Sequence, residues 1–196
     1  PTKAITIIVP FSPGGGVDTM GRLLAETLRG ILGQQVLVDN KPGASGMLGA
    51  LAVVRAPADG HTLLLGSAGE TAINPFIYKS KMQYAPDKDL APVGLVVRVP
   101  NVLIASPKAP FKTLDELVAY AKKNPGKLSY ASSGIGNPQH LNGELLEEMA
   151  GLHMVHVPYR GASGQLLDVA GGNVDMTFVS MAAAIPFIRD GRVKPI

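Results

Sequence analysis

The sequence predicts an α/β protein of two lobes, each a doubly wound and mainly parallel sheet, and two observations lead to this prediction. First, short runs rich in Ile, Val and Leu alternate with segments of helical character, as in parallel strands joined by covering helices. Second, the series strand, glycine-rich loop, helix and strand occurs twice, with Gly14 recurring as Gly134 and Gly43 as Gly161. We therefore place one lobe in residues 1–99 and the other in residues 100–196.

The individual elements follow from the same pattern. The helix from Leu114 has the clearest local signal, because Thr113 and Glu116 match a capping box and Asn124-Pro125-Gly126 ends the segment. The other expected helices are Asp18–Leu32, Ser45–Arg55, Gln139–Ala150 and Gly164–Ala170. The expected strands are Ile5–Val9, Gln35–Asp39, Thr62–Leu65, Val93–Val97, Asn101–Ala105, Leu128–Ala131, Met154–Val157 and Met176–Val179.

Two stretches bear on how the lobes are connected. Leu90–Pro107 contains two strand-like runs with no helix between them, which we interpret as the crossing from the first lobe to the second. After Ile185–Asp190, a turn at Gly191 leads into the strand-like Val193–Ile196, where the sequence stops. A strand that opens at the last residues is typical of a truncated chain, so we expect later residues to complete the first lobe.

Composition narrows the class of protein. Hydrophobic residues make up 46% and charged residues 17% of the 196 residues, which excludes a disordered chain, and no apolar run has the length of a membrane-spanning helix. The net charge of +3 comes from scattered basic residues, so the sequence predicts no nucleic-acid partner, while a small basic excess suits the capture of small anions. With no cysteine, disulfide and thiol chemistry are excluded.

The two glycine-rich loops are the first candidate site. Ser12–Gly16 and Ser132–Gly136 each follow a strand and precede a helix, whose first backbone N–H groups are unpaired and attract anions. One such loop is explained by a tight turn alone, but two in matching places favour an anion site that closure of a cleft between the lobes completes. Asp18 and His140 follow these loops; Asp18 either holds water or only caps its helix, and His140 is equally compatible with a functional and a structural role.

A third small-residue loop, Gly66–Gly69, also follows a strand. Ser67 in this loop and Asn74 after it offer hydroxyl and amide groups that orient a ligand, although a surface turn explains them equally well. Asp175 either projects toward the hinge or shapes its own turn.

Other chemistries fit poorly. Gly14–Gly16 lacks the Lys-Ser/Thr ending of a nucleotide-triphosphate loop, and neither Gly43–Gly46 nor Gly161–Gly164 has the spacing of a nucleophile elbow. His153 and His156 are three apart on a strand and so point to opposite faces, which argues against a metal pair. The sequence predicts no catalytic residue, no metal ion and no cofactor.

Several motifs together resemble one known family, the substrate-binding proteins of tripartite tricarboxylate transporters, also called Bug receptors. The resemblance extends from Ile5 to Ile196. The matching segments are Ile8–Asp18 (Ile-Val-Pro-Phe-Ser-Pro-Gly-Gly-Gly-Val-Asp), Asn40–Gly46 (Asn-Lys-Pro-Gly-Ala-Ser-Gly), Ala72–Pro75, Phe111–Leu114, Tyr130–Gly136 with His140 and Leu141, and Val157–Gly161.

The resemblance implies a bacterial periplasmic receptor with the type II-like fold of periplasmic binding proteins. It implies that the two lobes close on a small organic acid, a di- or tricarboxylate, an amino acid or another carboxylate, and deliver it to membrane permease subunits. Family members hold a ligand carboxylate between loops like Phe11–Asp18 and Ser132–Gly136, partly through water. Carried over by position and joined to the candidates above, the expected ligand-binding residues are Phe11, Gly14, Gly15, Gly16, Asp18, Ser67, Asn74, Ser133, Gly134, Gly136, His140, Tyr159 and Asp175.

This sequence departs from the family pattern in two places. Family members continue well past the equivalent of Ile196, and Glu70 stands in a loop that tends to carry neutral polar residues. If Glu70 faces the ligand, it favours an amino acid or a monocarboxylate over a dicarboxylate. Two rival functions remain: an α/β hydrolase or transferase that uses Ser67 or Ser133 with His140, and a ligand sensor that reports to a signalling partner.

Overall fold

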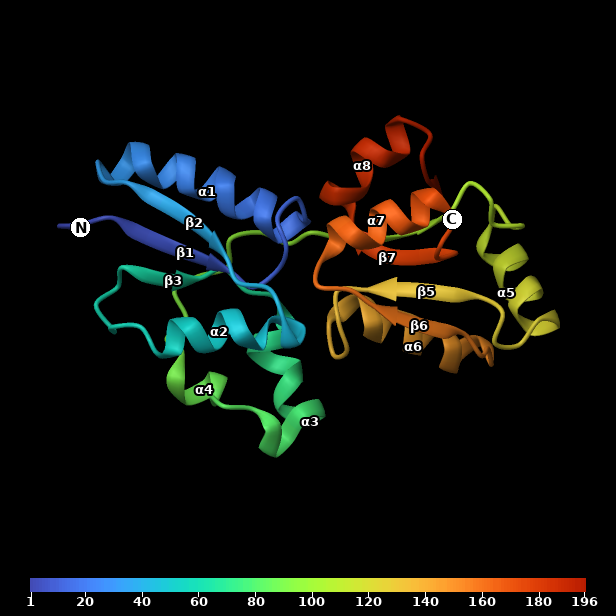
Figure 1. Cartoon of the computed structure of the whole chain (residues 1–196), viewed down its shortest axis with the longest axis horizontal. Helices are drawn as coiled ribbons and strands as arrows, with labels where there is room; N and C mark the ends of the chain where they lie inside the picture. Colours follow the sequence, from blue (N-terminus) through green and yellow to red (C-terminus); the bar gives the residue numbers. More distant parts are fainter. The chain divides into compact units, whose positions relative to one another are not determined.

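The computed structural model describes all residues from Pro1 to Ile196, and the chain divides into two compact units, Pro1–Val96 and Val97–Ile196. Figure 1 shows both units. In unit one the elements are β1 (Ile5–Val9), α1 (Gly16–Leu32), β2 (Val36–Asn40), the 3₁₀ turn η1 (Ala44–Gly46), α2 (Met47–Val54), β3 (Thr62–Leu64), the π-helical turn η2 (Gly69–Ile73), α3 (Asn74–Tyr78), the 3₁₀ turn η3 (Lys79–Lys81) and α4 (Pro86–Asp89). In unit two they are β4 (Asn101–Ala105), α5 (Leu114–Lys123), β5 (Ser129–Ser132), α6 (Pro138–Ala150), β6 (Val155–Pro158), α7 (Ala162–Gly171), β7 (Met176–Ser180), α8 (Met181–Arg189) and β8 (Lys194–Pro195).

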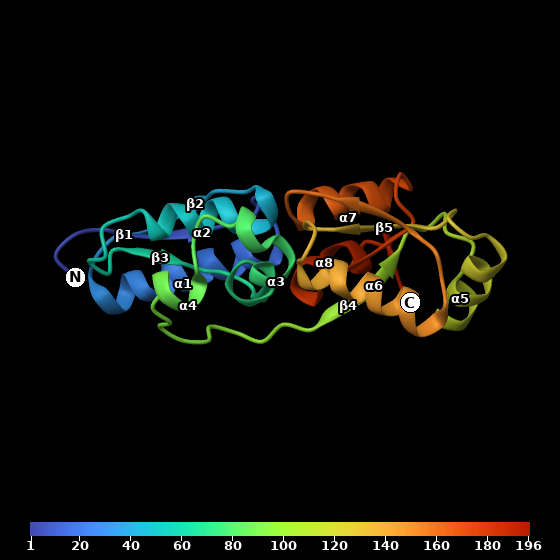
Figure 2. The ribbon, with the colours of Figure 1, turned by 90° about the horizontal axis from the view of Figure 1, so that it is seen from below.

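Unit one is a three-stranded parallel sheet in the order β2-β1-β3, with a helix on each face. The buried side chains of Ile5, Ile7 and Val9 pack under α1, because alternate residues of a strand point to the same face. Figure 2 shows α2 on the opposite face of this sheet. There Gly49 lies so near Pro10 that a Cβ atom on it would stand 2.6 Å from the proline Cβ, so glycine is required for the contact.

The long helix α1 ends at the predicted Leu32 and begins at Gly16, two residues before the predicted Asp18. Asp18 lies in its first turn and Arg29 in its last, and both charges complement the helix dipole. Gly33 follows the helix with φ of 63°, a left-handed conformation that glycine adopts without strain, and its N–H donates to the Arg29 carbonyl. The helix therefore holds its amino end at the tip of β1.

Unit two is a five-stranded sheet in the order β6-β5-β7-β4-β8. β6, β5 and β7 are parallel to one another, whereas β4 is antiparallel to both of its neighbours. Ile104, Ala131 and Val179 belong to the core under α7 and α8, and the alternating residues Ala105 and Tyr130 belong to the core under α5 and α6. The predicted doubly wound α/β class is confirmed, with β4 as an antiparallel addition.

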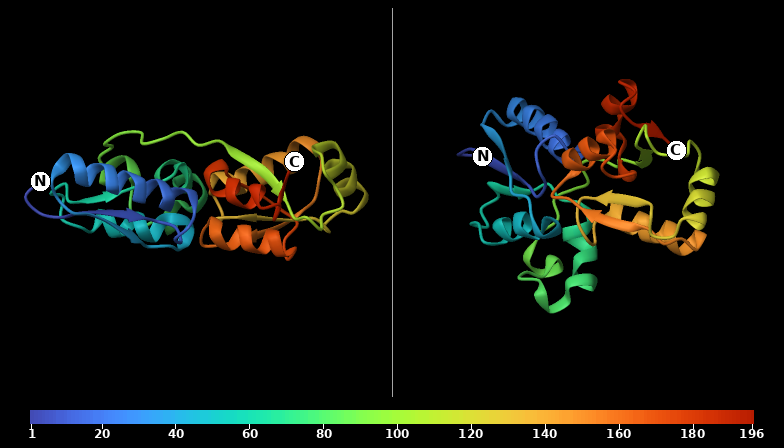
Figure 3. Two further views of the ribbon diagram at one scale, coloured as in Figure 1. Left: turned by 90° about the horizontal axis from the view of Figure 1, so that it is seen from above. Right: turned by 45° about the vertical axis from the view of Figure 1, so that its right-hand side comes forward.

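One predicted strand is wrong. Val93–Val97 lies in the segment that leads into β4, which Figure 3 shows without strand or helix, and Val93 is 88% exposed. Its composition favours a strand, but a strand also requires a neighbouring strand to satisfy its backbone, and no strand of this chain pairs with it. The apolar pattern alone is therefore not sufficient to predict a strand.

The end of the chain and three further helices also differ from the prediction. The tail that the sequence predicts as a strand does pair, as the short edge strand β8, with Pro195 opposite Ile104. The helices α3, α4 and α8 were not predicted, and α8 contains Pro186, a residue that normally marks the end of a helix. No helix in the structure combines the length and the apolar character needed to cross a membrane.

Candidate functional site

The loop from β1 to α1 places the amino end of a seventeen-residue helix at the carboxyl end of a parallel strand (Figure 1). Gly15 is the N-cap residue, and no side chain makes a capping hydrogen bond to this helix. The first-turn N–H groups, from Gly16 onward, have no partner one turn earlier within the helix. This end therefore presents the positive pole of the helix dipole with no side chain bonded to its first N–H groups, while the Asp18 carboxylate in the same turn offsets part of that charge.

Asp18 organises this loop from beneath. Its side chain is only 3% exposed and accepts hydrogen bonds from the Gly14 N–H at 2.9 Å, from Arg22 at 3.0 Å and from Asn40 Nδ2 at 2.9 Å. Burial alone would raise the pKa of this carboxyl, but the hydrogen bonds of Arg22, Gly14 and Asn40 outweigh it and hold the pKa below its usual range. The carboxylate is ionised and fully engaged.

Three predictions for this loop change as a result. Asp18 was expected either to hold a ligand water or to cap its helix, but its oxygens accept from Gly14, Arg22 and Asn40 instead. Gly14 was expected to offer a free N–H, but that N–H donates to Asp18. Phe11 is buried in the unit, and its carbonyl accepts from Asn40 at 3.0 Å. Gly15 and Gly16 remain as the candidates in this loop.

The loop from β5 to α6, Ser132–Gly136, has the same backbone plan but satisfies its own N–H groups. Ser133 N–H donates to Gln139 Oε1 at 3.0 Å, and Gly134 N–H donates to Ser132 Oγ at 3.1 Å. Gly136 N–H reaches His140 Nδ1 at 3.4 Å. The backbone donors predicted at Ser133, Gly134 and Gly136 are therefore used within unit two, and the Ser133 hydroxyl is the group left for a ligand.

A buried network of neutral side chains lies under Ser133. Gln165 of α7, which has no exposed surface, donates through Nε2 to Ser133 Oγ at 2.5 Å and to Gln139 Oε1 at 3.2 Å. The Thr177 hydroxyl of β7 lies 2.9 Å from Gln165 Oε1 and 2.8 Å from the Ala131 carbonyl oxygen, and these acceptors share its one proton. Sequence reasoning missed Gln139, Gln165 and Thr177. A signal was available for Gln165, because it stands among Ala162, Leu166 and Val169 on the apolar face of α7.

Two histidines support the same loop. Ser132 Oγ lies 2.6 Å from His156 Nε2, and the His156 ring stacks on Tyr130 at 4.9 Å and packs against His140 at 4.4 Å between ring centroids. Burial, followed by the neighbouring His140, lowers the pKa of His156 to about 4, and burial also lowers the pKa of His140. Both rings are neutral at pH 7, as acceptors for the loop require. The predicted place of His140 beside the loop is what the structure shows.

The third loop encloses Glu70. This carboxyl is completely buried, accepts from the Ser67 N–H and from Ser67 Oγ, and lies where a Cβ atom on Gly46 would be 2.9 Å from Oε2. Burial raises its pKa to about 7 against the lowering effect of the Ser67 hydrogen bonds. The hypothesis that Glu70 faces a ligand is therefore wrong, because the side chain points into unit one. Asn74 is also fully buried and donates to the Ser45 carbonyl at 3.1 Å.

Two predicted residues of unit two serve the fold. Asp175 accepts from Ser129 N–H at 2.8 Å and from Ser129 Oγ at 2.7 Å, at the amino ends of β5 and β7. It lies at the opposite end of the sheet from Ser132–Gly136, so its predicted place in the ligand site is wrong and its turn-shaping alternative holds. The Tyr159 hydroxyl donates to Asp168, and burial raises the pKa of Tyr159 to about 12.

The serine–histidine pairs that a hydrolase would need do not form. Ser67 Oγ donates to Glu70 and Ser133 Oγ accepts from Gln165, and neither is bonded to His140. Ser132 and His156 are within hydrogen-bond distance, but Ser132 is completely buried. A serine without exposed surface has no access to a substrate carbonyl.

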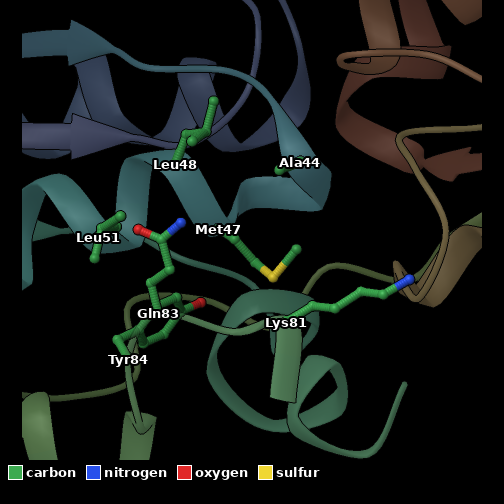
Figure 4. A pocket seen from close by; sticks show the side chains of 7 residues that line it. All are labelled: Ala44, Met47, Leu48, Leu51, Lys81, Gln83 and Tyr84. Atoms are coloured by element: carbon green, nitrogen blue, oxygen red, sulfur yellow. The ribbon is translucent and has the colours of Figure 1, made fainter. Parts of the chain in front are cut away.

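Each unit has a cavity or groove outside the two glycine-rich loops. Figure 4 shows one of about 70 Å³ in unit one, lined by Met47, Leu48 and Leu51 of α2 together with Gln83 and Tyr84. A shallower groove of about 550 Å³ in unit two runs along α5 and α6, lined largely by apolar side chains. Neither contains a predicted ligand-binding residue. No group of three or more His, Asp or Glu side chains is arranged to hold a metal ion.

The class of protein follows from these observations. Two α/β units that each present a glycine-rich loop and a helix amino end at the tip of a parallel strand define the two-lobed binding-protein fold. Residues 20–196 match the family described as the tripartite tricarboxylate transporter family receptor, and the chain belongs to this family.

Curated relatives agree with this assignment. The chain is 39% identical over 196 residues to the protein of the tcbD–tcbE intergenic region of Pseudomonas sp. strain P51, covering all of this chain and 58% of that protein. It is 37% identical over 196 residues to Protein BugT of Bordetella pertussis, covering all of this chain and 60% of that protein. The chain thus spans less than two thirds of the length of these relatives.

Solved structures show the same fold. The whole chain superposes on an R. palustris protein with adipate (TM-score 0.97, 37% identity, 65% of that chain) and on the periplasmic binding protein BugD (0.93, 37%, 64%). It also superposes on MatC from Rhodopseudomonas palustris with bound malate (0.93, 33%, 66%). Two of these three similar proteins were thus solved with a dicarboxylate, and all three confirm the predicted two-lobed fold class.

Proposed function

We propose that this chain is the ligand-binding part of a periplasmic solute receptor that captures a small organic carboxylate and delivers it to a membrane permease. The observation that carries this proposal is the α1 amino end, where a long helix presents its first N–H groups without a side-chain cap. Family membership and the adipate and malate ligands of similar proteins support a carboxylate as the anion. The net charge of +3 supports the attraction of an anion to either unit.

Each unit has its own part in the proposed contact. Unit one contributes the charge complement, from the N–H groups at Gly15 and Gly16 on a helix end that Asp18 and Arg22 hold in place. Unit two contributes a neutral donor, the Ser133 hydroxyl. Binding that uses both units stabilises the closed arrangement of the lobes, which is the form that a permease would recognise. No bond is made or broken in this function.

The test is thermal melting of the full-length protein with mono-, di- and tricarboxylates and acidic amino acids. A ligand that binds only the folded state raises the melting temperature, so adipate or malate at a hundred times its Kd adds about 2.7 kcal/mol of stability. We expect selective stabilisation by one class of carboxylate. If protein freed of carried-over ligand shows no shift with any of these acids, the proposed function is wrong.

A substitution at the helix end tests the site itself. Gly16→Glu places a carboxylate in the first turn of α1, where it favours the helix dipole but occupies and repels the anion position. We expect the folded protein to keep or gain up to about 1 kcal/mol of stability and to lose carboxylate affinity at least about tenfold. Isothermal titration with adipate and malate measures the loss.

The matched control is Gly30→Glu. It adds the same charge to the same helix at an exposed position where a side chain meets nothing within 4 Å. Equal affinity losses in both variants would show that net charge, and not the amino end of α1, attracts the ligand. Delivery to a permease has a separate test, which is loss of uptake of the identified acid when the gene is deleted from a strain that retains the permease.

A further inference from the structure

The hydrogen bonds beneath Ser133 form a continuous chain with no charged member. They run from Thr177 Oγ to Gln165 Oε1 at 2.9 Å and from Gln165 Nε2 to Ser133 Oγ at 2.5 Å. A branch runs from Gln165 Nε2 to Gln139 Oε1 at 3.2 Å. Gln165 and Thr177 have no exposed surface, and Ser133 retains a small exposed part. A buried network in which every polar atom has a partner holds its members in one arrangement.

The direction of each hydrogen bond in this chain follows from one backbone group. Ser133 N–H donates to Gln139 Oε1 at 3.0 Å, and an N–H cannot accept, so this atom of Gln139 is an oxygen. The Gln165 atom that faces it must then be a donor, which places Nε2 there and Oε1 toward Thr177. The reverse orientation of the Gln165 amide would bring two carbonyl oxygens together without a proton.

These hydrogen-bond directions determine where the proton of the Ser133 hydroxyl can point. Both Nε2 protons of Gln165 are committed, one to Gln139 Oε1 and one to Ser133 Oγ. Because Ser133 Oγ already accepts from within the unit, its own proton has to point to a different acceptor. The hydrogen bonds of Ser133, from Gln165 to its Oγ and from its N–H to Gln139, leave that proton for a ligand. We propose that Gln165 is a positioning residue that turns the Ser133 hydroxyl into a directed donor for one oxygen of the bound ligand.

This inference rests on the proposed function and adds a rule of selectivity to it. A hydroxyl whose proton is directed at the ligand favours an acceptor, such as a carboxylate oxygen, over an ammonium or amide N–H, which would leave that proton without an acceptor. Because Gln165, Gln139 and Thr177 do not titrate, the donor itself is independent of pH in the natural protein. A change that makes position 165 titratable should therefore make the affinity depend on pH.

Gln165→Glu is that change, because the two side chains have nearly the same shape. When ionised, the glutamate only accepts, so the Ser133 proton turns inward and the ligand loses its donor. When protonated, the buried carboxyl again donates to Ser133 Oγ, and burial raises the pKa at which this occurs. We expect affinity for adipate or malate to fall about ten- to hundredfold at pH 8 and to recover as the pH is lowered toward 5.

The experiment compares four proteins by isothermal titration across this pH range, with melting temperatures recorded in parallel. Ser133→Ala should lose affinity to a similar extent at every pH, and Gln35→Glu, the same change at an exposed position of unit one, should follow the natural protein. Ratios to the natural protein at each pH remove the effects of the histidines and of the ligand's own ionisation. If adipate and malate fail to bind the natural protein, the proposed function fails; if they bind it and Gln165→Glu shows no change in that ratio with pH, this inference alone fails.

A second variant keeps the test decisive if Gln165→Glu does not fold. Thr177→Val has nearly the same shape and removes the hydroxyl that donates to Gln165 Oε1, so the amide keeps the direction set by Gln139 but is held less firmly. We expect a smaller loss of affinity, about two- to fivefold, that adding Ser133→Ala does not increase beyond the effect of Ser133→Ala alone. Fully additive losses would mean that Thr177 and Gln165 do not act through Ser133.

Discussion

The two glycine-rich loops share a backbone plan but are supported by different chemistry. In unit one the support is a buried, ionised carboxylate, Asp18, which gathers the Gly14 N–H, Arg22 and Asn40. In unit two the support is neutral and consists of the Gln139 amide, the Ser132 hydroxyl and two imidazoles. The same loop conformation can therefore occur in both units although different side chains support it.

The difference extends beyond these two loops. Unit one also holds the Gly66–Gly69 loop with a carboxyl group, Glu70, whereas the loop of unit two at Ser133 is held by the neutral amide of Gln165. Burial raises the pKa of the Glu70 carboxyl and lowers the pKa of the His156 imidazole. These two groups should therefore change the stability of their units with pH in opposite directions, which makes the comparison testable.

The largest effect should come from removing the support of the first loop. Asp18→Ala leaves Arg22, Asn40 and the Gly14 N–H without their acceptor, and breaking such a partly buried group costs about 3 to 4 kcal/mol of unfolding free energy. Urea unfolding measures it. Asp59→Ala, which removes an exposed pair with Lys3 and a hydrogen bond from the His61 N–H, is the control and should cost far less. Equal losses in both variants would show that Asp18 does not organise the loop.

Glu70→Gln should change the pH dependence of unit one. The folded pKa of Glu70, about 7, lies above its ordinary value of 4.5, so the folded state keeps a proton that the unfolded state releases. Stability then falls as pH rises from 4.5 to 7, by up to about 3 kcal/mol. The glutamine variant should lack this fall in urea titrations at pH 5 and pH 8. A slope that survives the substitution would have to come from another group.

His156→Gln should act in the opposite sense on unit two. The pKa of His156 in the folded state, about 4, lies below its ordinary value of 6.5, so between these values the unfolded state binds a proton that the folded state does not bind. The contribution of His156 to the free energy of unfolding is therefore fully present above pH 6.5. It declines as pH falls toward 4, by about 1 to 2 kcal/mol after allowance for partial exposure. The glutamine variant should flatten this decline, whereas His153→Gln, at an exposed position, should leave it unchanged. Identical curves for both variants would contradict the role given to His156.

Local signals predicted the elements that local interactions build. The strands at Ile5–Val9 and Asn101–Ala105 and the helix Leu114–Lys123 have the predicted bounds, because side-chain periodicity and the Thr113 cap are read within a few residues. Val93–Val97 has the same local signal but forms no strand, since pairing depends on a second segment. The helix α8 was missed for the converse reason. Pro186 disfavours a helix locally, but the packing of α8 on α7 and β4 outweighs that effect.

What the sequence by itself determined is the α/β class, the position of both glycine-rich loops and the family. These follow from patterns that neighbouring residues carry, and from motifs specific enough to identify relatives. Only the tertiary structure decided which polar groups are already engaged, since the decisive partners are distant along the chain: 22 residues for Asn40 and Asp18, 32 for Gln165 and Ser133, and 46 for Ser129 and Asp175. A polar side chain shows its chemistry in the sequence, but whether it serves a ligand or the fold depends on what the fold brings next to it.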